Sequence, residues 1–407
     1  MYATMDAAPM VRWRRDRAVK IHEFQAKHLL APYGPNVPDG GVAITAEEAG
    51  AIARRLGGAV VVKAQIHAGG RQRAGGIRLA ATPAEAEAAA GDLLGEPLVT
   101  EQTGPAGQIV RRVLVEAAVP VRRELHLALL VDSASGEVML IGSGRGGADI
   151  EEQAARGELR IRELRLGTGS EARDQVVAAF LATLGLEGAL HEQACALVDG
   201  LRRAFVELDA NLIELNPLAI TEDGKLAALD VKMVLDDNAL FRHPELAALR
   251  DEDDTSAIEL QAQRHQLNYV QLDGDIGMVA NGAGLGLATL DMLVAAKGRP
   301  ANFMDIRTTA KSLDIAHGFG LLLDNPATRA ILINVHGGGM QACDTIAEGL
   351  GIALRRTGRS LPLVVRLAGN NADFARSRLQ NFGCAVIDCP DMWTAASQAV
   401  ALAERRA

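Results

Sequence analysis

The sequence predicts an α/β protein, chiefly because short apolar runs alternate with helical segments in the second half of the chain. Such alternation is typical of a parallel, doubly wound sheet with helices on both faces. The apolar runs of strand length are residues 276–279, 302–306, 330–335, 363–367 and 385–388. Two further observations agree with this class. The first half also mixes helices with strands, and 407 residues are too many for one core, so we expect several domains.

Composition excludes several classes of protein. Acidic residues number 51 against 42 lysines and arginines, and aromatic residues make up only 3%, so a nucleic-acid interface built on base stacking is not expected. No apolar run approaches the roughly 18 residues that span a bilayer. The four cysteines show neither a CxxC pair nor zinc-ligand spacing, which is typical of the reducing cytoplasm; they are Cys195, Cys343, Cys384 and Cys389. We expect a cytoplasmic protein without nucleic-acid or membrane partners.

Three parts are expected along the chain. Residues 1–19 are rich in arginine and lack the apolar centre of a secretory signal, so we interpret them as a disordered N-terminal extension. The acidic stretch 250–254 indicates a linker between a first domain, 20–255, and a second domain, 256–407. Arginine far outnumbers lysine, a bias typical of GC-rich bacteria.

The elements of the first half follow from periodicity and from turn residues. Thr45 and Thr82 each begin a capped helix, and the first of these helices ends at the glycine pair 57–58. Apolar residues at helical spacing also predict helices at 21–33 and 171–209. Apolar or alternating runs predict strands at 59–63, 77–80, 113–117, 124–131, 138–141, 212–215 and 225–231.

A lysine and a glycine-rich loop follow one of these strands. Lys63 ends the strand 59–63, and residues 68–76 contain two glycine pairs together with Arg71 and Arg73. Glycine lets backbone N–H groups approach phosphate oxygens, and a lysine supplies charge to the same anion. The loop matches neither GxxxxGK[ST] nor GxGxxG, so neither a P-loop nor a dinucleotide-binding fold is indicated. A plain β-hairpin with a basic turn is the alternative.

Oxygen-bearing side chains occur in pairs further along the chain. Asn216 lies on one predicted strand and Asp230, 14 residues later, on the next, so a turn at 222–224 would place them side by side. Hard oxygen ligands on adjacent strands suit Mg²⁺ that holds nucleotide phosphates. Glu116 and Glu124 could accept hydrogen bonds from an adenine amino group and a ribose hydroxyl. An ordinary hairpin with carboxylates at its edge is the structural alternative.

The order of these features, from lysine through glycine loop and paired glutamates to Asn and Asp, resembles an ATP-grasp domain. Longer segments resemble the β subunits of succinate–CoA ligase and of the similar malate–CoA ligase. The resemblance covers residues 20 to about 400, and its clearest segments are Lys20-Ile-His-Glu-Phe-Gln-Ala-Lys27, Val62-Lys63-Ala-Gln-Ile-His-Ala-Gly-Gly-Arg71, Glu214-Leu-Asn-Pro-Leu218, Asp237-Asn-Ala-Leu-Phe-Arg242, Asn281-Gly-Ala-Gly284, Pro300-Ala-Asn-Phe-Met-Asp305 and Val365-Arg-Leu-Ala-Gly-Asn370.

This resemblance implies a fold and a set of site residues. The fold is an ATP-grasp domain followed by a flavodoxin-like, doubly wound parallel-sheet CoA-ligase domain. The implied Mg²⁺ ligands are Asn216 and Asp230. The implied nucleotide contacts are Lys63, Gly70, Arg71, Gln72, Glu116, Val119 and Glu124. The implied substrate contacts are Asn281, Gly338, Gly339 and Met340.

The resemblance also implies a reaction and a partner. ATP or GTP, a small dicarboxylate and coenzyme A would give acyl-CoA, nucleoside diphosphate and phosphate. The phosphoryl group would pass through a phosphohistidine on an α subunit that also carries the CoA site, in a heterodimer or an α2β2 heterotetramer. Succinate is the first expectation, and malate or another small hydroxylated dicarboxylate is the alternative. A carboxylate–amine ligase of the ATP-grasp class and a non-catalytic nucleotide-binding paralogue are the competing hypotheses.

Three departures from the family pattern concern the substrate and the nucleotide loop. Arg307 and the two threonines after it stand where the family has glycines, and His336-Gly-Gly-Gly-Met340 replaces Phe-Gly-Gly-Ile. Gln72 stands where a glycine is expected. Arg307 and His336 therefore become candidate specificity residues for an added polar group on the substrate; the alternative for His336 is a packed histidine. No G-x-S-x-G motif occurs, which argues against a hydrolase.

Overall fold

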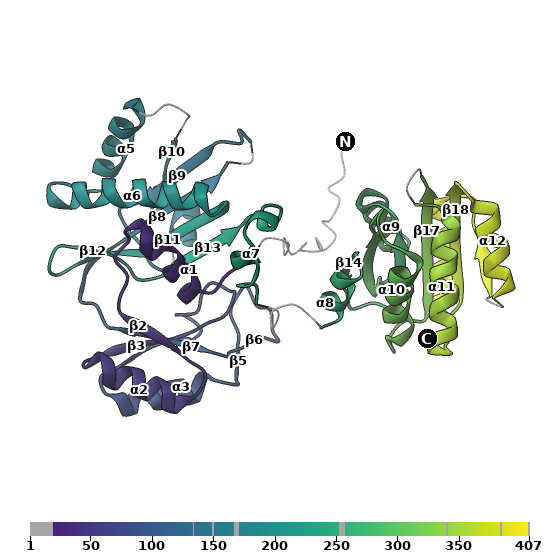
Figure 1. The fold of residues 1–407 in the computed structure, drawn as a ribbon, viewed down its shortest axis with the longest axis horizontal. Helices are drawn as coiled ribbons and strands as arrows, with labels where there is room; N and C mark the ends of the chain where they lie inside the picture. The colour runs from purple at the N-terminus through teal and green to yellow at the C-terminus, as the bar shows by residue number, and fades with distance from the viewer. Residues whose placement is uncertain are drawn as a thin grey trace. The chain divides into compact units, whose positions relative to one another are not determined.

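The computed structural model describes residues 19–132, 134–148, 150–166, 171–251, 257–338, 341–382 and 385–405. The chain divides into two compact units, 1–251 and 252–407, and this division falls inside the acidic segment 250–254 (Figure 1). The predicted N-terminal extension 1–19 lies almost wholly outside the described residues, as do Gly339 and Met340. Within the described part of the chain, no helix has the length and hydrophobicity that crossing a bilayer requires.

A small antiparallel sheet carries the glycine loop of the first unit. Its strands are ordered β2 (Gly40–Ala43), β7 (Val113–Ala117), β3 (Val60–Ala64) and β4 (Ile77–Ala80). Two helices pack with it, α2 (Ala46–Leu56) and α3 (Pro83–Leu93). Both begin as the sequence predicts, because the hydroxyls of Thr45 and Thr82 accept hydrogen bonds from backbone N–H groups three residues later. The loop between β3 and β4 thus starts from a fixed, buried strand.

A larger antiparallel sheet forms the second part of the same unit. Its path runs β1 (Val19–Lys20), β13 (Val231–Leu235), β11 (Ala210–Thr221), β8 (Val121–Val131), β9 (Val138–Ser143) and β10 (Arg162–Arg165), and β12 (Leu226–Ala228) pairs with β11. Helix α6 (Ala189–Glu207) packs on β11 and shares a core with Leu127, Leu129 and Ile213. The remaining elements are α1 (Glu23–Leu30), η1 (Ala31–Tyr33), β5 (Pro97–Leu98), β6 (Gln108–Ile109), α4 (Ile150–Ala155), α5 (Glu171–Thr183), η2 (Leu240–Arg242) and α7 (Pro244–Ala247).

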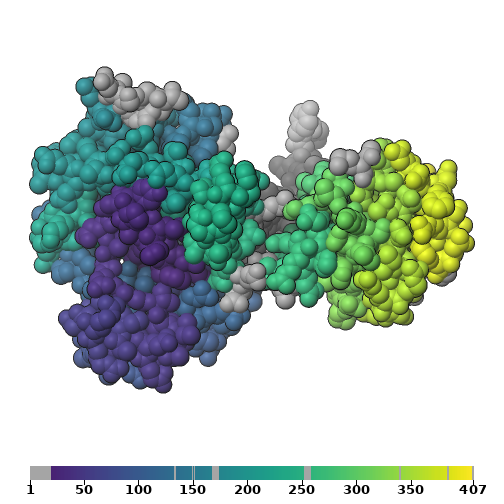
Figure 2. Space-filling view, in the orientation of Figure 1, coloured from purple at the N-terminus to yellow at the C-terminus, as the bar shows by residue number. Residues whose placement is uncertain are grey.

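Helix α1 lies between these two sheets. In the space-filling view the dark purple start of the chain sits between the lobe that carries α2 and α3 and the teal residues of α6 (Figure 2). One face of α1 is buried, and it includes the charged residues Glu23 and Lys27 together with Ala26 and Leu30. A single helix therefore presents charged side chains to residues of both sheets.

The second unit confirms the predicted doubly wound α/β fold. Its sheet has the order β14 (Leu267–Gln271), β16 (Asn302–Ile306), β15 (Ile276–Ala280), β17 (Ala330–Gly337), β18 (Leu363–Gly369) and β19 (Val386–Asp388). The pairs from β16 to β19 are parallel, whereas β14, which was not predicted, pairs antiparallel with β16. The helices are α8 (Ala257–Arg264), α9 (Ala283–Ala295), α10 (Ser312–Asp324), α11 (Cys343–Thr357), α12 (Ala372–Asn381) and α13 (Met392–Glu404).

Burial on both faces explains why these strands read as continuous apolar runs. In β17, Ile331 and Ile333 face a core shared with α10 and α11, while Ala330 and Leu332 face a second core shared with α9 and α13. Alternate residues of a strand point to opposite faces, so a sheet covered on both sides needs apolar residues at every position. The edge strand β14 has only one neighbour, and its exposed Val270 and Gln271 weaken the apolar signal.

One helix–loop contact in the first unit makes a stability prediction. A Cβ added to Gly200 of α6 would collide with the carbonyl oxygen of Tyr33, whereas a Cβ at the exposed Gly91 of α3 would meet only the Cβ of Ala46 at 3.8 Å. We expect Gly200→Ala to lower the free energy of unfolding by about 1–3 kcal/mol. Gly91→Ala, the matched control, should leave it unchanged or raise it by about 0.5–1 kcal/mol, because alanine favours helix. Urea denaturation followed by circular dichroism measures both, and equal effects would contradict the packing argument.

Candidate functional site

Lys63, the residue before the last of β3, lies in a buried cluster of charges. Its Nζ donates to Glu23 Oε1 at 2.9 Å and to the carbonyl oxygen of Leu229 at 2.6 Å, and it lies 2.7 Å from Glu116 Oε2. Burial alone would lower the pKa of Lys63, but the charges of Glu23, Glu116 and Asp230 outweigh it and raise this pKa above its ordinary value. Lys63 is therefore a fixed cation at a strand end.

Helix α1 supplies a second lysine that mirrors the first. Lys27 Nζ lies 2.6 Å from Glu116 Oε1 and 2.9 Å from Glu23 Oε1, and it donates to the Leu229 carbonyl at 2.7 Å. The lysine and glutamate side chains are each at least nine-tenths buried. Two lysines and two glutamates thus surround one backbone carbonyl.

Arg71 of the glycine loop extends this cluster to the second sheet. One guanidinium nitrogen lies 2.7 Å from Glu23 Oε2 and 2.8 Å from Asp230 Oδ2, and the other donates to the carbonyl of Ala64 at 2.9 Å. The six ionised groups balance, with three cations and three anions: Lys27, Lys63, Arg71, Glu23, Glu116 and Asp230. We call these six residues the charge cluster. Its side chains come from both sheets and from α1.

The glycine loop is wound into turns above this cluster. Backbone N–H groups of Gly75 and Gly76 donate to the carbonyls of Gln72 and Arg71 at 3.1 and 2.8 Å. Gly70 and Gly75 have positive φ angles of 76° and 75°, which explains glycine there, but Gln72 has no positive φ. The replacement of glycine by Gln72 therefore adds no backbone strain. β3 and β4 do form an antiparallel hairpin, and Gln72 and Arg73 are exposed in its turn, as in the alternative that the sequence left open. Arg71 differs from them because its side chain is buried.

Asn216 and Asp230 lie side by side, as the hairpin predicted. The Asn216 N–H donates to the Asp230 carbonyl at 3.1 Å, and a cis peptide joins Asn216 to Pro217. The Asn216 side chain bonds Gly147 in both directions, accepting at 2.9 Å and donating at 3.3 Å. Asp230 faces Arg71, so its carboxylate already holds a cation. Asn216 lies midway along β11 and Asp230 directly precedes β13, so two hard oxygens are close together, but the Asp230 carboxylate is paired with Arg71. Their role as Mg²⁺ ligands stays a prediction.

The two glutamates that were predicted to act together lie in different surroundings. Glu116 points into the charge cluster from β7, whereas Glu124 is exposed on β8 of the larger sheet. Glu124 Oε2 would be 3.0 Å from a Cβ on Gly147, so its carboxylate lies beside the backbone that Asn216 binds. Val119 is half-buried in the connection between β7 and β8. The structure therefore groups Glu124 with Asn216 and Glu116 with Lys63.

Sequence reasoning missed three members of this site. Glu23, Lys27 and the carbonyl of Leu229 entered only as parts of longer segments, without a role. A signal was present, because Glu23, Lys27 and Leu30 share one face of α1 at intervals of four and three residues. Charged residues at positions that should be apolar indicate buried ion pairs.

A neighbouring group of histidines does not form a convincing metal site. Among the described residues, His22, His67 and Asp251 could hold a metal ion, with ligand atoms within 4.8 Å of one another. His22 Nε2 and Asp251 Oδ2 are hydrogen bonded at 2.5 Å. The pKa of His67 is lowered to about 3, first by its burial and then by the neighbouring His22. However, an Arg112 nitrogen lies 3.7 Å from the same Asp251 oxygen, and this positive charge disfavours a dication. We interpret the group as a hydrogen-bonded contact.

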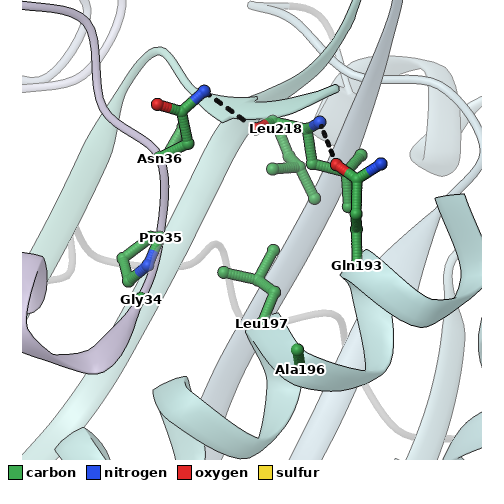
Figure 3. Close-up of a pocket in the computed structure, with 9 residues that line it drawn as sticks. Gly34, Pro35, Asn36, Gln193, Ala196, Leu197 and Leu218 are labelled. Atoms are coloured by element: carbon green, nitrogen blue, oxygen red, sulfur yellow. Dashed lines mark hydrogen bonds between the residues drawn. The ribbon is translucent and has the colours of Figure 1, made fainter. Parts of the chain in front are cut away.

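A small pocket of about 230 Å³ opens on the larger sheet, away from titratable groups (Figure 3). Asn36 donates to the Leu226 carbonyl, and Gln193 accepts from the Leu226 N–H, across its rim. No charged side chain is among its lining residues, which are Gly34, Pro35, Asn36, Gln193, Ala196, Leu197, Leu218, Leu226 and Ala228. The pocket therefore offers phosphate or a metal no charged side chain.

In the second unit, Asn281 joins two strand ends. It follows β15, and its amide accepts from the His336 N–H at 2.9 Å and donates to the His336 carbonyl at 2.8 Å. The His336 side chain is exposed, so the packed-histidine interpretation is wrong. Gly338, the last described residue of the glycine turn, is half-buried and donates to the Gln341 carbonyl at 3.1 Å.

Comparisons with known proteins define the class. A family model for the ATP-grasp domain matches residues 20–220, and one for CoA-ligase matches 279–400. The ATP citrate lyase of Methanothrix soehngenii, solved with citrate and coenzyme A, has a similar fold, with a TM-score of 0.73 and 18% identity over 94% of this chain and 100% of that one. The fold and site therefore define an ATP-grasp protein with a CoA-ligase domain.

Curated relatives specify the family. The β subunit of ADP-forming succinate–CoA ligase from Solibacter usitatus is 43% identical over 386 residues, covering 95% of this chain and all of the relative. The corresponding subunit from Acidiphilium cryptum is 44% identical over 399 residues, covering 96% of this chain and all of the relative. The chain belongs to the succinate–CoA ligase β-subunit family, which confirms the resemblance drawn from the sequence. It is an acid–thiol ligase subunit.

The charge cluster makes a prediction that depends on pH. Burial acts to raise the pKa of Glu23, but Lys27, Lys63 and Arg71 hold it well below its ordinary value of 4.5. Glu23→Gln leaves buried cations without their shared anion, so we expect it to lower the free energy of unfolding by about 3–5 kcal/mol at pH 7. Because the folded pKa is depressed, the wild-type advantage should be complete above pH 4.5 and shrink as the pH falls through the folded pKa.

Urea denaturation of the wild type and of Glu23→Gln between pH 3 and 7 measures the difference in their free energies of unfolding. The matched control is Asp199→Asn on α6, an exposed carboxylate 2.9 Å from Arg202, for which we expect a change within about 0.5 kcal/mol. A Glu23→Gln effect as small as that of the control would contradict the role given to the cluster.

Proposed function

We propose that this chain is the β subunit of a nucleoside-diphosphate-forming ligase that joins a small carboxylic acid to coenzyme A, with succinate as the first substrate to test. The overall reaction converts nucleoside triphosphate, acid and coenzyme A into acyl-CoA, nucleoside diphosphate and phosphate. The observation that carries the proposal is the meeting of Lys63, Arg71 and Asp230 in one place, because a nucleotide's phosphates need cations and their metal needs an oxygen ligand.

Each predicted nucleotide contact has a defined task in this proposal. Lys63 and Arg71 supply positive charge to the phosphates, and the loop from Gly70 to Gln72 supplies backbone N–H groups. Asp230 and Asn216 would hold Mg²⁺, which neutralises phosphate charge when bound. The base and ribose contacts would come from Glu116, Val119 and Glu124. ATP is the first nucleotide to test because the curated relatives are named as ADP-forming, and GTP is the alternative.

The proposal requires a second subunit. We assign the phosphohistidine and the CoA site to an α subunit, in a heterodimer or an α2β2 heterotetramer in the bacterial cytoplasm. In the CoA-ligase unit, Asn281 and the glycine turn from Gly338 to Met340 would contact the acid. The family membership supports this division, because the relatives are themselves named as β subunits.

The alternative substrate is malate or another small hydroxylated dicarboxylate. Two polar residues at the carboxyl end of the second sheet favour it: Arg307 follows β16, and His336 is the residue before the last of β17. A non-catalytic paralogue is disfavoured because Lys63, Asn216 and Asp230 are all present and in mutual proximity.

Asp230→Asn tests the nucleotide site. The variant removes the charge of a metal ligand, and we expect it to slow nucleotide-dependent phosphorylation of the co-produced α subunit by about 100-fold or more. Asp223→Asn in the same hairpin is the matched control, because the Asp223 side chain is 57% exposed and its partners among the described residues, Lys225 and Thr221, belong to the same turn. Transfer of labelled phosphate to the α subunit is the measurement. Normal transfer in Asp230→Asn would overturn the assignment.

A further inference from the structure

The inference concerns the edge of the second sheet where Asn281, Arg307 and His336 lie. The strands of this sheet are ordered β14-β16-β15-β17-β18-β19. After β15 the chain forms β16 on one side of β15, and it then forms β17 on the other side of β15. Such a reversal opens a crevice at the carboxyl ends of the strands, and open α/β sheets bind ligands there. Asn281 follows β15, Arg307 follows β16, and His336 lies near the end of β17. Asn281 and His336 therefore border the crevice directly, and Arg307 lies beside it, at the end of the strand next to β15.

Arg307 is tied to this crevice by a chain of hydrogen bonds. Its Nε donates to Asn268 Oδ1 at 3.1 Å, and Asn268 Nδ2 donates to Asp305 Oδ2 at 2.8 Å. Asp305 Oδ1 in turn accepts from the backbone N–H of Gly282, which precedes α9, at 2.6 Å. Two strands and a helix start thus fix the base of the Arg307 side chain.

The remaining donors of Arg307 are not neutralised by protein. Arg307 is exposed, and among the described residues no carboxylate lies within ion-pair distance of it. Asp305, two residues earlier, is 5% exposed and already satisfied by Asn268 and Gly282. An anchored guanidinium with free terminal N–H groups at the mouth of a ligand crevice suits an oxygen anion or a hydroxyl.

The backbone does not explain the arginine. Arg307, Thr308 and Thr309 have no positive φ and are exposed, so the segment needs no glycine and the side chains fill no core. His336 is exposed as well, and its backbone is held by Asn281. Arg307 and His336 therefore place exposed polar side chains at the rim.

We propose that Arg307 is a specificity-determining residue that selects an oxygen-substituted succinate, meaning a succinate skeleton with an additional hydroxyl or carboxylate group. The guanidinium would donate to that added oxygen group, and the exposed His336 lies near the end of β17, with β15 between β17 and the strand β16 that precedes Arg307. Succinate offers no such group, so the exposed guanidinium would remain bound to water. The inference rests on the proposed function, since it names the acid that the ligase takes.

The test is a substrate panel with the complete complex of this chain and its α subunit. The acids are succinate, malate, tricarballylate and methylsuccinate, and the last is the control for size because it adds carbon without oxygen. We expect malate or tricarballylate to exceed both succinate and methylsuccinate in kcat/KM for acyl-CoA formation. In Arg307→Gly this preference over succinate should fall by roughly 5- to 150-fold, the loss expected when a charged hydrogen bond to substrate is removed.

Two further variants separate specificity from folding. Arg307→Lys keeps the charge and should retain part of the preference, whereas Arg359→Gly removes an exposed arginine beyond the end of α11 and should leave every ratio unchanged. An unchanged ratio in Arg307→Gly, or a wild-type preference for succinate or methylsuccinate, would overturn the inference while the ligase assignment stands. If no acid gives acyl-CoA and the α subunit is not phosphorylated, the proposed function fails and the inference fails with it.

Discussion

The first unit depends on a buried set of charges that must balance. Glu23, Lys27, Lys63 and Glu116 are each more than nine-tenths buried, and an ion at such depth is tolerated only when it is paired and hydrogen bonded. The carbonyl of Leu229 takes a hydrogen bond from each lysine, and Arg71 links Glu23 to Asp230. The positions of the small sheet, the large sheet and α1 therefore have to be mutually consistent. If one of these parts were displaced, a buried charge would be left without its partner.

The sequence predicted those parts of the structure that follow from local pattern. Helix starts at Thr45 and Thr82 and the hairpin that pairs Asn216 with Asp230 appear as expected, and the strand predicted at 59–63 is present at 60–64. Pattern could not show which side chains meet across long distances in the chain. The partnership of Glu116 with Lys27 and Lys63, and its separation from Glu124, arise from how two sheets dock, and no periodicity encodes that.

The same contrast holds in the second unit. Its parallel strands were visible because both faces are buried, as the alternating cores of β17 show. The edge strand β14 was missed because an antiparallel edge carries no such run. Arg307 and His336 could be singled out only as departures from a family pattern, and only the structure shows their exposure and the anchoring of Arg307 through Asn268. Whether a residue outside a regular pattern is buried or available to a ligand is a property of the assembled fold.

The charge cluster also bears on how the first unit folds. Lys27 binds Glu116 across 89 positions of the chain and Leu229 across 202, so these contacts are among the most non-local that the unit contains. Closing such loops costs conformational entropy before the contacts that they bring together can form. The cluster should therefore be absent from the folding transition state. Weakening it would accelerate unfolding and leave the rate of folding almost unchanged, so the cluster acts mainly on the lifetime of the native state.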